Sequence, residues 1–189
     1  QSLVLRFVLT AAFVTGAASF MYEIGWVRML SLALGSSLHS FELMLAAFIG
    51  GLAFGGLYIR KRLDGIQAPL RYFGWVQVFM GLSALATLPL YDHVFDFVGW
   101  IIASLARTDG GYALYNLATA AVSIAIMVPA AFFAGMTLPL MTFALLRRGV
   151  GERAIGLVYA ANTVGAILGV MLMVHVLMPA LGLKLSIVL

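Results

Sequence analysis

The chain has 189 residues, of which 63% are apolar and only 10% are charged, and its mean hydropathy is +1.09. Because a soluble domain is about 45–50% apolar and about 25% charged, this composition excludes a soluble globular domain and indicates an integral membrane protein. The net charge of +4 comes mainly from short basic clusters between apolar runs, which indicate membrane topology rather than nucleic-acid binding, and the absence of cysteine excludes disulfides and thiolate metal sites.

Apolar runs of about 20 residues, the length that crosses a bilayer as a helix, follow one another along the chain. They predict one all-α transmembrane domain over residues 1–189, with five crossings and the start of a sixth. The expected spans are 3–33, 39–59, 70–90, 112–146 and 154–179, with a truncated sixth helix from 181. Gln1 leads almost directly into apolar sequence, which indicates a fragment or the ordered part of a longer protein.

The first span contains two charged residues, Glu23 and Arg28. If the first two spans form an antiparallel hairpin around Gly35, Arg28 and Glu42 lie at equal depth and are expected to form an ion pair. Glu23 lies about 140° from Arg28 around a helix and has no such partner. Two interpretations stay open: the three charges connect helices or reach the outer surface, or Glu23 lies on a cation or proton pathway.

Three further intramembrane side chains are candidates for a site. Tyr22 and Trp26 are four residues apart and either flank a cation beside Glu23 or belong to an interfacial aromatic belt. Asn162 falls near the middle of the fifth span. It either forms a hydrogen bond between helices or lines a path through the bundle.

Two segments in the second half of the chain have distinctive patterns. Apolar residues recur at helical spacing after residue 94, which predicts an amphipathic helix over 94–106 on the outer membrane surface. These residues are Phe95, Val98, Ile102 and Leu105. Pro129 and Pro139 predict a kink or a break in the long fourth span.

Basic clusters set the expected orientation. Residues 60–65, with Arg71 beyond them, and residues 147–153 fall on one side if every span crosses once. The positive-inside rule makes that side cytoplasmic, so the N-terminus is expected inside and 91–111 outside.

An internal comparison relates two segments that cross in opposite directions, LAAFIGGLAFGG (45–56) and YAANTVGAILGV (159–170). They share glycines at a constant offset, which pairs Gly51 with Gly165 and Gly55 with Gly169. This pattern is expected of a three-plus-three inverted repeat, and it also arises from small residues at close helix contacts without common descent. Either interpretation makes the four glycines helix-packing positions.

Enzyme signatures are missing from the sequence. It has no glycine-rich nucleotide loop after a strand, no nucleophile elbow and no zinc-binding helix motif. We therefore expect no catalytic residue, no metal and no cofactor in this chain.

Four stretches together resemble the membrane part of the bacterial fused major-facilitator/spermidine-synthase proteins. They are FMYEIGWVRMLSLALGSS (20–37), LAAFIGGLAFGG (45–56), AGMTLPLM (134–141) and VYAANTVGAILG (158–169). The cluster of Tyr22, Glu23, Trp26 and Arg28 and the segment that runs from Asn162 to Gly165 are the most specific parts.

The resemblance implies half of a major-facilitator bundle in the bacterial inner membrane. In that family such helices are joined to a cytoplasmic aminopropyltransferase-like domain that takes decarboxylated S-adenosylmethionine and putrescine, and this domain has no counterpart here. The expected function is a non-catalytic scaffold or anchor of a spermidine-synthase-like protein within a larger membrane assembly. Its expected partners are the lipid bilayer and other membrane subunits or a cytoplasmic synthase-like domain. The alternative is a transporter-type bundle that moves a polyamine or another cation.

Overall fold

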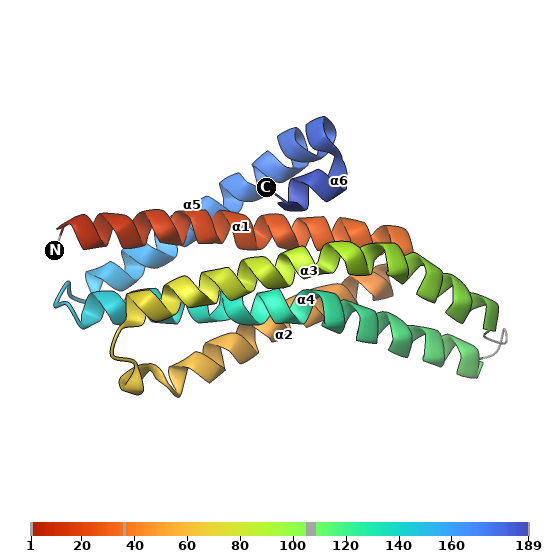
Figure 1. The fold of residues 1–189 in the computed structure, drawn as a ribbon, viewed down its shortest axis with the longest axis horizontal. Coiled ribbons are helices and arrows are strands. Elements are labelled where there is room, and N and C mark those ends of the chain that lie inside the picture. The colour runs from red at the N-terminus through yellow and green to blue at the C-terminus, as the bar shows by residue number, and fades with distance from the viewer. Residues whose placement is uncertain (1, 36, 105–108, 189) are drawn as a thin grey trace.

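The computed structural model describes residues 2–35, 37–104 and 109–188, and these form a helical bundle without strands (Figure 1). Five stretches are long and apolar enough to cross a membrane: Leu3–Leu34, Leu38–Arg60, Pro69–Tyr91, Gly110–Leu146 and Arg153–Val188. The helices are α1 (Ser2–Leu34), α2 (Leu38–Arg60), the short η1 (Leu63–Gly65), α3 (Pro69–Ser104), α4 (Asp109–Leu146), α5 (Arg153–Leu172), the π-helical η2 (Met173–Leu177) and α6 (Met178–Val188). An all-helical fold compatible with a multi-pass membrane protein is therefore confirmed.

For α1 and α2, the main neighbour in space is not the next helix in sequence. Helix α2 packs chiefly along α4, and α1 packs chiefly along α5, while α3 lies against α4. The N-terminus and the loops after α2 and α4 gather at one end of the bundle, where the basic clusters lie (Figure 1). We refer to this end as the basic end.

Glycines allow the two main helix pairs to approach closely. In the α2–α4 pair, a Cβ atom at Gly55 would collide with the Phe132 carbonyl, and one at Gly51 would lie 2.7 Å from the Ala131 Cβ. In the α1–α5 pair, a Cβ atom at Gly165 would collide with the Phe13 carbonyl. One at Gly169 would lie 2.7 Å from the Ala17 Cα. All four glycines lie at backbone contacts between helices, where no larger residue fits without a shift.

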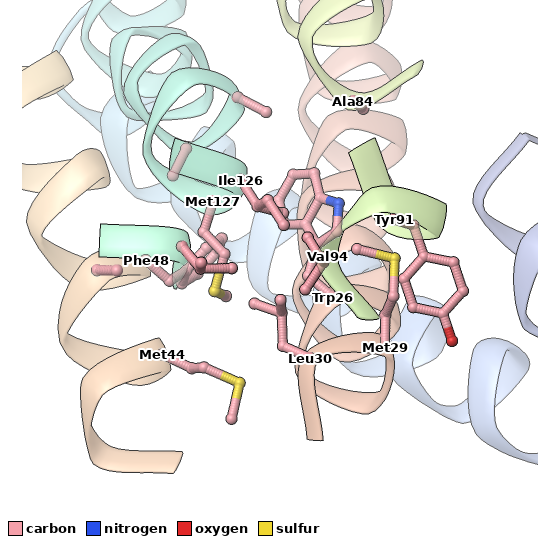
Figure 2. Close-up of a cluster of buried hydrophobic side chains, with 14 of the residues drawn as sticks. Trp26, Met29, Leu30, Met44, Phe48, Ala84, Tyr91, Val94, Ile126 and Met127 are labelled. Carbon is pink, nitrogen blue, oxygen red and sulfur yellow. The ribbon is translucent and has the colours of Figure 1, made fainter. Parts of the chain in front are cut away.

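A hydrophobic core forms around Trp26, whose side chain is only 1% exposed. Its indole Nε1–H donates a hydrogen bond of 3.1 Å to the Thr87 hydroxyl of α3. Figure 2 shows the ring among buried side chains from α1, α3 and α4, with Met44 and Phe48 of α2 nearby. A second cluster, which includes Val8, Ile59 and Leu140, fills the bundle toward the basic end.

The segment expected as a separate surface helix over 94–106 instead continues α3 through Ser104. Its buried residues are Val94, Val98 and Ile101, whereas Phe95 and Ile102 are exposed. Leu105 lies outside the described residues. Because α3 packs against α4, its buried face is formed by positions 94, 98 and 101. The apolar face expected from the sequence, with positions 95, 98 and 102, is only partly buried.

The fourth and fifth spans also differ in detail from expectation. Helix α4 continues through Pro129 and Pro139, so the expected break is absent, while a kink at these prolines stays a prediction. The fifth span changes to π-helix at Met173, and the last helix turns at Gly182, where φ is +75°. Ile187 of the returning segment is buried and lies against Gly25 of α1.

Candidate functional site: a polar groove between four helices

A groove of about 310 Å³ lies where the two helix pairs meet. Its walls come from α1, α2, α4 and α5, and glycines hold these helices close together. The lining residues are Thr15, Gly16, Ser19, Phe20, Leu52, Gly56, Ala134, Gly135, Thr137, Leu138, Pro139, Tyr159 and Asn162. The groove opens to the outside of the bundle beside Tyr159, which is 48% exposed.

Hydroxyl and amide groups line the groove, and some of them are already paired. Thr15 donates to the Ala11 carbonyl at 2.8 Å, and the Thr137 hydroxyl accepts a bond of 3.1 Å from Gln77. The side chains of Ser19 and Asn162 form no hydrogen bond with any described residue. The groove therefore offers donors and acceptors to something outside the bundle.

Glu23 lies on the same side of α1 as the groove. It follows Ser19 by four residues and Gly16 by seven, so the three lie along one face of the helix. Its side chain is half-buried, and its carboxylate has no hydrogen bond or ion pair with the described part of the chain. Glu23 does not line the groove itself but continues its polar face by one helical turn.

The expected ion pair between Arg28 and Glu42 is not formed in the described structure. Glu42 instead lies 3.7 Å from His39, three residues earlier on α2, and both are exposed. The exposed Arg28 lines a separate cavity of about 550 Å³ beside Val174 and Met178. The predicted ion pair was wrong because α1 packs along α5 and α2 along α4, so equal depth does not bring these side chains together.

Tyr22 and Trp26 also have other roles than the sequence indicated. Their rings stack on each other with centroids 5.5 Å apart, and Trp26 is buried and hydrogen-bonded to Thr87. A fully buried indole cannot belong to an interfacial belt, so that interpretation is wrong for Trp26. The stacked pair contributes to the hydrophobic core.

Asn162 stands out in the sequence, but four other polar residues of the groove do not: Thr15, Ser19, Thr137 and Tyr159. Hydroxyl residues are common in membrane helices, where they bond to their own backbone and give no signal by themselves. One signal was present, because Phe-x-x-Gly occurs at 13–16 and again at 132–135. In both places the phenylalanine carbonyl meets a glycine of the crossing helix.

Neutral side chains line the groove. Its lining contains no Lys, Arg, Asp, Glu or His, and no cluster of metal-binding side chains occurs among the residues described. No family model, curated protein or solved structure matches the chain. Any assignment of function therefore depends on the geometry of this face and on the sequence resemblance.

Proposed function

We propose that this chain is a non-catalytic membrane scaffold that packs laterally against another membrane-embedded unit. The face formed by α1, α2, α4 and α5 is the contact surface. One observation carries the proposal: this face holds an open groove with unpaired polar side chains, including Ser19 and Asn162. The carboxylate of Glu23 extends the same face.

In a bilayer, an uncovered groove would expose these polar groups to hydrocarbon. Hydrocarbon offers them no hydrogen-bond partner, and a charged carboxylate at the bilayer centre costs roughly 2.5–3.5 kcal/mol even on the lenient insertion scale. Helices of a second unit can supply partners and cover the groove. Hydrogen bonds between membrane helices contribute about 0.6–2 kcal/mol each, enough to favour one face of the bundle over the others.

We further propose that the bundle is built as a three-plus-three inverted repeat, like half of a major-facilitator bundle. In such a repeat α1 corresponds to α4 and α2 to α5. The α1–α5 glycine contact then corresponds to the α4–α2 glycine contact, and the similarity of the two contacts supports this arrangement. Gly165 meets the Phe13 carbonyl, and Gly55 meets the Phe132 carbonyl. By these contacts Gly55 is the counterpart of Gly165. The sequence comparison instead matched Gly51 with Gly165, which differs by four residues, or about one helical turn.

The proposed scaffold anchors a spermidine-synthase-like protein in the bacterial inner membrane, with the N-terminus in the cytoplasm. The sequence resemblance and the gathering of basic residues at one end support this orientation. The chain has no cysteine, so Glu152→Cys introduces a single thiol. In intact cells this thiol should be protected from membrane-impermeant thiol reagents. Labelling of that cysteine from outside would reverse the orientation.

Substitution of Asn162 tests the lateral contact. Asn162→Ala removes the amide without adding bulk, so the protein should fold normally while the assembly dissociates at higher protein concentration. The assembly is measured by native mass spectrometry of membranes solubilised in copolymer discs. Thr163→Ala is the matched control, because Thr163 is exposed and bonds to its own helix at the Tyr159 carbonyl. Equal assembly of both variants with the unaltered chain would refute the contact.

A second candidate is transport of a polyamine or another cation, and the position of Glu23 favours it. The carboxylate lies one turn beyond a groove without cationic side chains. In proteoliposomes of the full chain, transport predicts putrescine uptake that Glu23→Gln abolishes while folding and assembly are preserved. A scaffold predicts no uptake by either form.

A further inference from the structure

Positive charge concentrates at the basic end of the bundle. Eight of the eleven Lys and Arg lie near the start of α1, at or near the connection from α2 to α3, or at the connection from α4 to α5: Arg6, Arg60, Lys61, Arg62, Arg71, Arg147, Arg148 and Arg153. The start of α3 and the end of α4 enclose a cavity of about 360 Å³, whose lining includes Arg71, Arg147 and Arg148. We propose that this cavity binds the phosphate-bearing headgroup of an anionic phospholipid, whose acyl chains lie along the exposed face of α3.

The cavity holds hydrogen-bond donors suited to a phosphate. One guanidinium nitrogen of Arg147 donates to the Ile66 carbonyl at 2.7 Å, which fixes this side chain while its other N–H groups stay available. Arg71 is exposed and has no ion pair or hydrogen bond with the residues described. Arginine forks bind phosphate oxygens in pairs, so two or three arginines around one cavity can hold a headgroup.

The backbone at the start of α3 adds to this arrangement. Pro69 opens the helix, and the first hydrogen bond of the turn runs from the Tyr72 N–H to the Ala68 carbonyl at 3.0 Å. The N–H groups of Leu70 and Arg71 come before that bond and have no partner within the helix. Both residues line the cavity. The positive end of the helix dipole thus supports the arginines.

An exposed apolar face on α3 distinguishes a lipid from free phosphate. Trp75, Val78, Phe79 and Leu82 follow Arg71 at helical spacing and are all about half exposed, with Trp75 at 58%. The ring centroids of Trp75 and Phe79 are 6.3 Å apart. Acyl chains can therefore extend from the arginine cavity along this face toward the membrane centre. Basic pockets beside membrane helices bind anionic headgroups in this way.

Titration of the full chain with phosphatidylglycerol and with phosphatidylcholine, read by native mass spectrometry, tests the proposal. Phosphatidylglycerol should bind more tightly than phosphatidylcholine. The variant R71Q/R147Q should bind phosphatidylglycerol about tenfold more weakly, since it loses charge-assisted hydrogen bonds. The matched control is R60Q/K61Q, which removes the same charge from the same end outside the cavity. If the double variant fails to fold, R71Q alone should still weaken binding several-fold.

Three outcomes distinguish a lipid headgroup from free phosphate, and both from non-specific attraction to the positive charge of the basic end. Trp75→Ala should weaken binding of phosphatidylglycerol, and inorganic phosphate should compete poorly with the lipid. Equal binding of inorganic phosphate, with no effect of Trp75→Ala, would assign the cavity to a free phosphate and overturn the lipid. An equal loss in R60Q/K61Q and R71Q/R147Q would show attraction to the whole basic end and overturn the site. This test does not depend on the proposed scaffold function.

Discussion

Trp26 shows how a single polar atom is accommodated in the membrane core. Its indole donates to Thr87, and the Thr87 hydroxyl donates in turn to the Ala84 carbonyl at 2.6 Å. Both polar groups are buried, and the Thr87 hydroxyl is the acceptor on which the indole N–H depends. The bond also connects α1 to α3, two helices that otherwise share few contacts.

Thr87→Val should therefore destabilise the fold. Valine keeps the shape of threonine but leaves the buried indole N–H without an acceptor, which costs about 1 kcal/mol in a membrane helix bundle. Unfolding of the purified protein in mixed micelles measures the change. Thr163→Val, at an exposed position, should leave the free energy of unfolding nearly unaltered. In the Trp26→Phe background Thr87→Val should lose most of its effect, and additive changes would contradict the bond.

The sequence pattern identified some of the important side chains but not the residues that they contact. Glu23, Asn162 and Trp26 stand out in the sequence because they are polar or large in an apolar run. Their environments depend on residues that are distant in sequence, such as Thr87 for Trp26. For Glu42 the partner is close in sequence, yet the exposed pair with His39 was missed because the hairpin was assumed.

At the scale of helices, glycine faces decide which elements pack together. Helix α2 follows α1 after a short loop, but its glycine face lies against α4. The sequence predicted the first four spans to within a few residues, because apolar length determines them, but the fifth was expected to end at 179 and instead continues to Val188. Pairing was not predictable from loop length. The extension of α3 to Ser104 was missed for a related reason, since its buried face is set by α4.

Alanine substitutions should separate glycines at crossings from glycines elsewhere in the same helices. Gly55→Ala and Gly165→Ala place a methyl group against a carbonyl of the crossing helix, so each should destabilise the fold by about 1–3 kcal/mol. Gly50→Ala and Gly156→Ala are the matched controls, because a Cβ atom there meets nothing within 4 Å. These controls should be neutral or stabilising by up to about 1 kcal/mol, as expected for alanine in a helix. Thermal unfolding in detergent gives the comparison.

The described bundle has two faces that differ in the side chains they present. One face, along α3, presents Trp75, Phe79 and other exposed apolar side chains suited to acyl chains. The other, formed by α1, α2, α4 and α5, contains the polar groove. A bundle that is uniformly surrounded by lipid has no need of such a difference. The proposed lateral packing against a second membrane unit accounts for this difference.

Photocrosslinking from the two faces tests this central claim most directly. A photoreactive phenylalanine analogue replaces Tyr159 beside the groove in one variant and Phe79 on α3 in the other, with the full chain expressed in its native membrane. Position 159 should crosslink to one discrete protein partner or second copy, and Asn162→Ala should reduce that product. Position 79 should crosslink to lipid. If both positions crosslink to lipid alone, the groove face is not a contact surface and the scaffold account is contradicted.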